Sequence, residues 1–383
     1  MLHRKKVYYR LSTSSGKTYL YEDGGANQIY NIYEKYDGTP VSILEFDVLP
    51  NAKIYDDLTP SIRKTICVEE DSGPIYPFFI SEVTLRKNKA KHCVCVSGAY
   101  FSRWFLVYNG KMRLDASDTI DHFTAPYKTH KHIQDLLNLA VKYNGYAVSS
   151  TSCPIINNFS VDFYSATQRG SEPTYTLKKY ANSSWGKSIY DLVLNIMKDR
   201  NLICRKSSVS ASQPTNGYTD ELRLISLDYI KTLDPNVIYT SDDVLAEDFQ
   251  ITDSLDTYYT EIVAIRSAPK EEDFPVNYSD YFETKTYSRD TANKGKHQYA
   301  VKLGKDETIT NIIGTTTDKI SSIRGIKQKI NVNPVVFDGG TLETYIGRRV
   351  RFETSILTGD FIVTKINRCI DFPEKSKFEF DKI

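Results

Sequence analysis

The spacing of apolar residues changes along the chain, and this change limits the folds that the chain can adopt. In the first part, apolar and polar residues alternate in short runs, as in segment 41–49, where a slip at Leu44 indicates a bulge. Turn-forming residues separate these runs at 71–74 and at 87–89. We therefore expect residues 1–112 to form a small antiparallel β-barrel.

The middle of the chain has a helical period instead. Thr129 can cap a helix, and Asn144 and Gly145 can end it. The apolar residues between them recur at intervals of three and four: Ile133, Leu136, Leu137, Ala140 and Val141. A short strand, 146–148, should follow this helix.

A second helix and strand occupy residues 187–204, with Asn182 or Ser184 as the expected cap. When the two units are aligned without gaps at an offset of 56, three polar residues match: Lys131 falls on Lys187, Asp135 on Asp191 and Lys142 on Lys198. A generic amphipathic pattern would explain the apolar matches alone, whereas these polar matches favour a duplication. We therefore expect residues 113–232 to be an α/β insert with a duplicated helix and strand unit.

Strand-like patterns return in residues 233–383, which we expect to form a second β-barrel. The polar stretch 268–334 is too long for an ordinary connection and should be an irregular excursion that splits this barrel. A closing hairpin is expected around 357–359. Its inward-facing residues should be Val350, Phe352, Phe361 and Val363, and Asp360 should be an exposed turn residue. The predicted fold class is thus α+β, with two small antiparallel β-barrels and a helix-bearing α/β insert between them.

Composition excludes several classes of protein. With 49 Lys and Arg against 48 Asp and Glu, the formal net charge is +1, so no global field attracts nucleic acid or an anionic membrane. A hydrophobic content of 40% is typical of a folded globular chain. No run is long and apolar enough to span a bilayer, and the amino-terminal residues 1–10 lack a signal core. We therefore expect no membrane segment and no secretion by a cleaved signal.

Cysteine and tyrosine are the two other informative residue types. The six cysteines lack a CxxC pair and fit free thiols in a reducing compartment: Cys67, Cys93, Cys95, Cys153, Cys204 and Cys369. The chain also has 28 Tyr but only 2 Trp. A glycan-binding surface could use such tyrosines, and an AT-rich coding sequence would explain them as well.

Two patterns resemble binding motifs but lack essential parts. Gly186, Lys187 and Ser188 look like the end of a phosphate-binding loop, but Ala181 stands where its earlier glycine is required. We expect this glycine only to begin a helix. Three histidines lie close in sequence but lack the i, i+4 spacing of a helical zinc site, so we expect them to be solvated: His122, His130 and His132.

Grouped acids are the remaining catalytic candidates. Glu69, Glu70 and Asp71 form one group, and Asp242 and Asp243 form the other. Paired carboxylates can cleave a glycosidic bond, but adjacent acids at a turn are usually solvated. No nucleophile elbow, papain-like motif or dinucleotide fingerprint is present. We therefore expect no catalytic, cofactor-binding or metal-binding residue, and no enzyme.

The densest basic run is 86–91, which contains Arg86, Lys87, Lys89 and Lys91. On a hairpin turn, such residues most simply keep a sheet edge soluble and block strand addition. They could also contact a negatively charged protein ring or passing DNA.

Three parts of the sequence resemble the phage tail baseplate hub family, the trimeric tail proteins that include late control protein D. Segments 66–70 and 75–83 look like a strand pair of that family, with Ser81 where a glycine is frequent. The unit 131–148, repeated at 187–204, is similar to its helix and strand element. Segments 346–352 and 358–366 resemble its closing strands, and Cys369 lies near a usual histidine.

The resemblance implies a structural role. In the family, two related barrels per subunit form a pseudo-sixfold ring in a homotrimer, which links the sixfold tail tube to the threefold central spike. The expected partners are therefore the tube protein, the spike protein and other baseplate proteins, with DNA able to pass but not specifically bound. The expected location is the tail of a virion or phage-like particle assembled in the host bacterial cytoplasm. The alternative is a tail-associated cell-wall hydrolase or glycan-binding protein.

Overall fold

The computed structural model describes eighteen segments of the chain: 5–10, 16–22, 24–25, 27–70, 75–107, 126–143, 156–180, 186–207, 218–235, 237–240, 250–254, 261–265, 282–286, 298–302, 327–332, 346–355, 357–372 and 375–383. The chain divides into two compact units. The first contains Met1–Phe249 and Val332–Glu379, and the second contains Gln250–Asn331 and Phe380–Ile383. The three-part division expected from the sequence stays a prediction.

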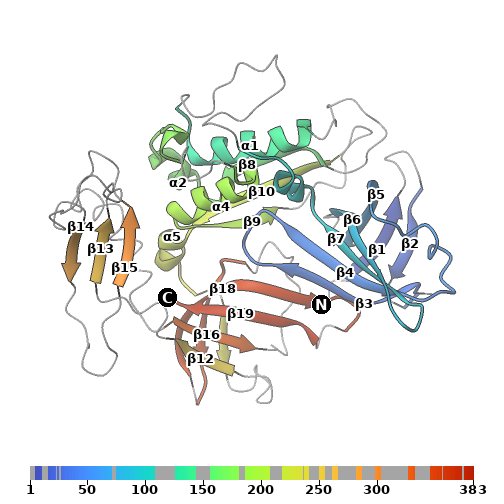
Figure 1. Cartoon of the computed structure of the whole chain (residues 1–383). Coiled ribbons are helices and arrows are strands. Elements are labelled where there is room, and N and C mark those ends of the chain that lie inside the picture. The colour runs from blue at the N-terminus through green and yellow to red at the C-terminus, as the bar shows by residue number, and fades with distance from the viewer. Residues whose placement is uncertain are drawn as a thin grey trace, which may run out of the picture. The chain divides into compact units, whose positions relative to one another are not determined.

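The amino-terminal part of the first unit is one curled antiparallel sheet (Figure 1). Its strands are β1 (Lys5–Arg10), β2 (Thr18–Glu22), β3 (Ile29–Tyr36), β4 (Ser42–Val48), β5 (Ser61–Glu70), β6 (Ile75–Leu85) and β7 (Lys91–Val96). They are paired in the order β3-β4-β7-β6-β5-β1-β2. All seven strands contribute side chains to a single buried apolar cluster, so the sheet curls around that cluster.

A buried ion pair shows how far the sheet curls. Lys5 Nζ lies 3.1 Å from Glu34 Oε2 and 3.1 Å from Glu70 Oε1. Strand β1, which carries Lys5, is separated from β3, which carries Glu34, by several strands in the sheet order. The two side chains can meet only because the sheet bends back toward itself. The first sheet therefore agrees in part with the predicted barrel, whereas two closed barrels stay a prediction.

The bulge expected at Leu44 lies on the neighbouring strand instead. Between the pairs Tyr30–Asp47 and Tyr33–Glu45, strand β3 contains one residue more than β4, while Leu44 itself pairs regularly. An extra residue bends and twists its strand, which increases the curl of the sheet. The irregular hydrophobic spacing of segment 41–49 therefore did not locate the bulge.

The predicted carboxyl-terminal hairpin is confirmed. Strand β17 (Arg349–Glu353) pairs with the start of β18 (Thr358–Cys369), and the end of β18 pairs with β3, from Ile366 opposite Tyr36 to Cys369 opposite Tyr33. The four expected inward residues of the hairpin, Val350, Phe352, Phe361 and Val363, are fully buried. β11 (Val237–Thr240) adds to β17 in parallel, and β19 (Lys377–Lys382) is the last strand. Strand β18 thus joins the carboxyl-terminal hairpin to the first sheet.

The insert is a small α/β layer within the first unit. Its sheet has the order β8-β10-β9, with β10 (Tyr218–Ser226) parallel to β8 (Ile156–Phe163) and antiparallel to β9 (Leu202–Ser207). Helices α1 (Thr129–Tyr143) and α4 (Ile189–Asp199) pack in one apolar cluster with this sheet (Figure 1). The shorter helices are η1 (Gly98–Arg103), α2 (Ala166–Ser171), η2 (Leu177–Tyr180) and α5 (Leu227–Thr232).

Two side chains of α1 fix the helix to the edge of β8. Asn138 accepts a hydrogen bond from the Phe159 N–H at 2.6 Å and donates one to the Phe159 carbonyl at 3.1 Å. One turn earlier, Gln134 Oε1 accepts from the Val161 N–H at 3.0 Å. These amides take the place of a neighbouring strand and so block strand addition at this edge.

The expected helices are confirmed, but one cap is corrected. Helix α4 begins after Ser188, whose Oγ accepts the Asp191 N–H while the Asp191 carboxylate accepts the Ser188 N–H. This capping box satisfies two free donors of the first turn and thereby fixes the start of the helix. The caps expected at Asn182 and Ser184, and the strand 146–148, lie outside the described residues, so the duplication stays a prediction.

The second unit contains short strands. β12 (Gln250–Ser254) pairs with β16 (Lys327–Val332), and β13 (Glu261–Ile265) pairs antiparallel with β14 (Phe282–Thr286) and parallel with β15 (Gln298–Lys302). Strands β14, β15 and β16 all fall within 268–334, so the expectation of an irregular excursion was wrong for these residues. These strands are short and contain charged and polar residues. The alternation of apolar and polar residues that indicates a strand could therefore not be recognised in them.

Candidate functional site

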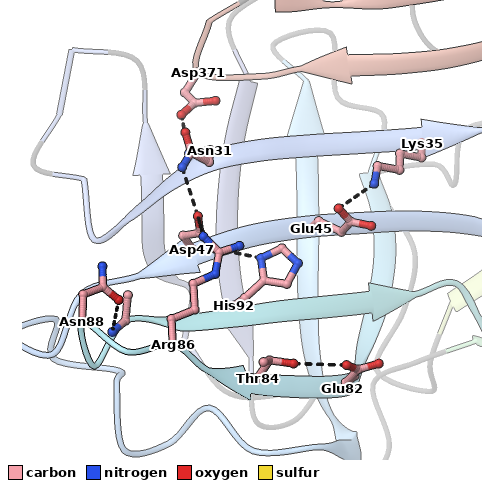
Figure 2. A network of polar contacts seen from close by, with 11 residues as sticks. Asn31, Lys35, Glu45, Asp47, Glu82, Thr84, Arg86, Asn88, His92 and Asp371 are labelled. Atoms are coloured by element: carbon pink, nitrogen blue, oxygen red, sulfur yellow. Dashed lines mark hydrogen bonds and ion pairs between the residues drawn. The ribbon is translucent and has the colours of Figure 1, made fainter.

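A polar network holds together one end of the first sheet (Figure 2). Its centre is Asp47 on β4, whose side chain is 3% exposed. Asn31 Nδ2 and an Arg86 guanidinium nitrogen each donate to Asp47 Oδ2 at 3.0 Å. His92 Nδ1 lies 2.8 Å from Asp47 Oδ1. One buried carboxylate therefore ties together β3, β7 and the turn after β6.

Asp371 connects this network to the carboxyl-terminal strands (Figure 2). Its carboxylate accepts the N–H of Asn31 at 2.7 Å and the N–H of Ile32 at 3.0 Å. Asn31 has a left-handed φ of 53° within the bulge of β3. The two hydrogen bonds satisfy N–H groups that the bulge removes from the strand ladder, and asparagine tolerates this conformation better than most residues.

The turn between β6 and β7 is fixed by contacts on several sides. Tyr55 Oη donates to the carbonyl of Lys89 at 2.5 Å, and Lys91 Nζ donates to the carbonyl of Tyr55 at 2.5 Å. Asn88 Oδ1 accepts the Ala90 N–H at 3.1 Å within the turn. Lys91 also lies 4.3 Å from the centre of the Tyr55 ring. The turn is thus held against the neighbouring loop 49–58.

Several residues near the turn between β6 and β7 and at the end of β4 are exposed. Leu85 is 65% exposed and Leu49 is 44% exposed, which is unusual for large apolar side chains. Lys87 and Lys89 are exposed at the tip of the turn.

The first sheet, the insert and the carboxyl-terminal segment are joined by buried hydrogen bonds. Tyr36 Oη donates to the Cys204 carbonyl at 2.7 Å, and burial raises the pKa of Tyr36 well above its ordinary value. Arg205 donates to the carbonyls of Ile346 at 2.6 Å and Gly347 at 2.9 Å, and burial lowers the pKa of its guanidinium. Each buried donor has a carbonyl partner, so these groups fix the arrangement of the first unit.

Three solved structures with a similar fold are tail proteins. The tail protein from Neisseria meningitidis MC58 has a TM-score of 0.57 and 11% identity, over 99% of this chain and 96% of that chain. The 43 kDa tail protein of prophage MuSo2 from Shewanella oneidensis has a TM-score of 0.55 and 10% identity, over 99% and 98%. Prophage tail protein gp18 from Listeria monocytogenes EGD-e has a TM-score of 0.54 and 8% identity, over 98% and 94%.

The chain shares its fold with these three tail proteins. No family model and no curated protein sequence matches it. The likeness is therefore one of three-dimensional structure, and it extends over nearly the whole length of each of the three chains.

The expectation that the grouped acids are solvated is wrong for one of them. Glu69 pairs with Lys17 at 2.7 Å, whereas Glu70 is buried and contacts Lys5 at 3.1 Å and Arg368 at 3.5 Å. Glu70 faces the interior because the curl of the sheet places its side of β5 there. The other acids, Asp71, Asp242 and Asp243, lie outside the described residues.

The histidine expectation is also corrected. His132 is fully buried, and its Nε2 lies 2.7 Å from the Tyr175 carbonyl. His130 is half-buried, and burial lowers the pKa of its imidazole. Neither is a freely solvated side chain, because the ring of His132 packs beside Tyr175 and the ring of His130 packs beside Phe163. His122 lies outside the described residues.

The Gly186 to Ser188 segment begins a helix, as expected, and is occupied by internal contacts. The Gly186 N–H donates to the Val107 carbonyl at 3.0 Å, and the Lys187 carbonyl accepts the Val107 N–H at 2.9 Å. Ser188 Oγ belongs to the capping box of α4. The N–H groups of Gly186 and Ser188, which a phosphate loop would use to bind its ligand, are therefore engaged within the chain.

The cysteines of the described segments are free thiols. Cys67, Cys93, Cys95, Cys204 and Cys369 are all buried, and Cys153 lies outside the described segments. Burial raises the pKa of Cys93 to about 12, so its reactive thiolate is scarce at neutral pH. The part of the chain that the structure describes contains no group of His, Cys, Asp and Glu side chains suited to a metal ion. Nor does it contain a helix with the length and apolarity needed to cross a membrane.

Proposed function

We propose that the chain is a structural subunit in the tail of a phage or phage-like particle. The observation that carries this proposal is the fold likeness to three tail proteins over nearly their entire lengths. A local resemblance could reflect one common motif, but a likeness of this extent includes the sheet, the insert and the carboxyl-terminal strands together.

The position that we propose in the particle is the hub between tail tube and central spike. In this proposal the curled first sheet closes into one barrel and the carboxyl-terminal strands build a second. A homotrimer then presents six similar faces to a sixfold tube and three faces to a spike. The shared strand β18 supports this arrangement, because it would hold the two barrels of one subunit in a fixed relation.

We further propose that the chain assembles and does not catalyse. The buried acids of the first sheet are engaged by cations of the same chain, as Asp47 is by Arg86 and Glu70 by Lys5. A carboxylate held in this way is not placed to transfer a proton to a substrate. Binding in such a subunit would come from apolar anchors and shape complementarity over large interfaces.

Mass photometry of the purified chain tests the oligomer. We expect trimers of the 43.8 kDa chain, formed either alone or when tube or spike protein is added. A stable dimer under both conditions would contradict the hub. A peptidoglycan release assay on the same sample tests the absence of catalysis, because a tail-associated hydrolase would release soluble fragments and a structural subunit would not.

A glycan-binding role is the second candidate, and one aromatic cluster favours it. Trp104 is 46% exposed, and behind it the rings of Phe79 and Phe101 stack with centres 4.9 Å apart. Arg103 lies between the rings of Tyr100 and Tyr190, at 4.9 Å and 4.4 Å. Binding of the chain to peptidoglycan that is lost in Trp104→Ala would support this candidate.

A further inference from the structure

We propose that Lys5 and Glu34 of the folded chain become joined by an amide bond between their side chains, with Glu70 as the group that transfers the protons. This inference goes beyond the proposed function and does not depend on it. It is carried by three observations: one buried amine contacts two buried carboxylates, one oxygen of Glu70 has no hydrogen-bond partner, and the cluster is shielded from water.

The three groups are in contact inside the curled first sheet. Lys5 Nζ lies 3.1 Å from Glu34 Oε2 and 3.1 Å from Glu70 Oε1. The exposed fractions of the Lys5, Glu34 and Glu70 side chains are 4%, 1% and 0%. An amine that the fold holds this close to a carboxyl group needs no diffusional encounter with it, which removes much of the entropic part of the barrier.

The two carboxylates have different surroundings, and these assign their roles. Glu70 also lies 3.5 Å from Arg368, a second cation, and its Oε2 is buried without a hydrogen-bond partner. Within the described segments, Glu34 forms an ion pair with Lys5 alone. The unbonded oxygen of Glu70 is able to accept a proton, as general acid and base function requires. Glu34 is therefore the group that forms the bond.

The reaction needs no reagent from outside the chain. The ammonium of Lys5 transfers one proton to Glu70, and the neutral amine then attacks the carboxyl carbon of Glu34. A carbon–nitrogen bond forms and a carbon–oxygen bond breaks. The proton on Glu70 and a second proton from the nitrogen leave with that oxygen as one water molecule, and Glu70 returns to its charged form. This is a single event within the chain and not the turnover of a substrate.

Burial favours the product of this reaction. Two ions in an apolar interior have a desolvation cost that their attraction offsets only in part, whereas an amide is neutral. The link removes one positive and one negative charge, so Glu70 and Arg368 remain as a balanced pair. The amide joins β1 to β3, which are not neighbours in the sheet order, and so closes the curled sheet covalently.

A second buried pair shows what the reaction requires. Lys206 Nζ lies 3.6 Å from Asp220 Oδ2, and both side chains are buried. In the part of the chain that the structure describes, no second carboxylate lies within ion-pair distance of Lys206. Its amine lies instead 5.7 Å and 5.1 Å from the ring centres of Tyr76 and Phe78. Without a second carboxylate to transfer protons, this pair should stay unlinked.

Intact mass spectrometry of the purified and denatured full chain tests the proposal. We expect a mass lower than that of the unmodified sequence by one water, and a protease digest should contain a peptide that joins Lys5 to Glu34. Lys5→Met removes the amine but keeps a long unbranched side chain, so this variant should have the full mass of its sequence. Lys35→Met is the matched control, because Lys35 forms a partly exposed ion pair with Glu45, and it should still lose one water.

The role of Glu70 is tested by Glu70→Gln, which keeps the size of the side chain but cannot transfer a proton in this way. We expect the linked fraction to fall by about tenfold or more at equal times after purification, because a general acid–base group contributes at least this much to a rate. Circular dichroism should show that the variants are folded.

An unmodified mass for the folded parent chain would overturn the proposal. So would a loss of water that persists in Lys5→Met, or a link from Lys5 to a carboxylate other than Glu34. A folded Glu70→Gln chain that links as fast as the parent would contradict the role of Glu70.

Discussion

The hydroxyl of Tyr36 on strand β3 donates a hydrogen bond to the backbone carbonyl of Cys204 on strand β9, 2.7 Å away. The two residues are 168 positions apart in sequence, and Tyr36 is 2% exposed. The Cys204 N–H donates in turn to the Gly38 carbonyl at 2.7 Å. This pair of contacts fixes the insert to the turn between β3 and β4.

Removing that hydroxyl should therefore weaken the first unit. Tyr36→Phe leaves a buried carbonyl without its donor, which costs about 1 to 3 kcal/mol of unfolding free energy. Urea denaturation followed by fluorescence measures the change. Tyr30→Phe is the control, because Tyr30 lies on the same strand and is partly exposed. Equal midpoints for the two variants would mean that the contact does not hold the insert.

The second prediction concerns the centre of the polar network (Figure 2). Asp47→Asn removes a buried negative charge from Arg86 and His92, and we expect a loss of about 2 to 3 kcal/mol because hydrogen bonds to charged groups are strong. Glu45→Gln, on the same strand, breaks the partly exposed pair with Lys35 and should cost less than about 1 kcal/mol. Chemical denaturation of both variants compares them. A Glu45 variant as destabilised as the Asp47 variant would contradict the importance of burial here.

The third prediction concerns the core of the carboxyl-terminal hairpin. Phe361 is fully buried, and its ring lies 5.4 Å from that of Phe352 in an edge-to-face arrangement. Phe361→Ala should cost about 3 to 5 kcal/mol through lost burial and the cavity that remains. The expected result is a low yield of soluble subunit and a lower denaturation midpoint. A midpoint equal to that of the parent would show that this strand is not part of a stable core.

Asp360 was expected from the sequence to be an exposed turn residue whose replacement changes little, and the structure contradicts this. Its carboxylate accepts hydrogen bonds from Arg349 at 2.6 Å and from Arg351 at 2.7 Å and 3.0 Å. The hydrogen bond from Arg351 is the largest cause that lowers the pKa of Asp360 to about 2. The two arginines stand on β17, so the carboxylate joins both strands of the hairpin.

The fourth prediction follows from that lowered pKa. The charged carboxylate stabilises the fold above its ordinary pKa of 3.8, and this contribution is lost as the pH falls toward 2. Asp360→Asn should therefore be about 1 kcal/mol less stable than the parent near neutral pH, a modest value because the group is partly exposed. The difference should vanish near pH 2. Urea midpoints measured across this range test it, and a difference that is independent of pH would contradict the ionic explanation.

Local patterns predicted the local structure well. The spacing from Ile133 to Val141 identified helix α1, and the alternation around Val350 and Phe361 identified the closing hairpin. Both signals come from residues that are neighbours in sequence and share one environment. The strands β14 to β16 were missed because charged and polar residues fill much of their short length.

The candidate site could not be predicted in the same way. Asn31 and Asp371 are 340 positions apart, and no spacing in the sequence indicates that they meet. Glu70 was expected to be solvated, but its burial depends on how the whole sheet curls. The basic run of the β6–β7 turn was visible in the sequence, whereas the contacts that hold this turn to Asp47 and to Tyr55 depend on the fold.

Electron cryo-microscopy of purified particles is the most direct test of the proposed function. We expect density for this chain at the junction of tail tube and central spike, as three copies around the tail axis. Absence of the chain from the tail, or copies arranged along the length of the tube and not at its end, would contradict the hub.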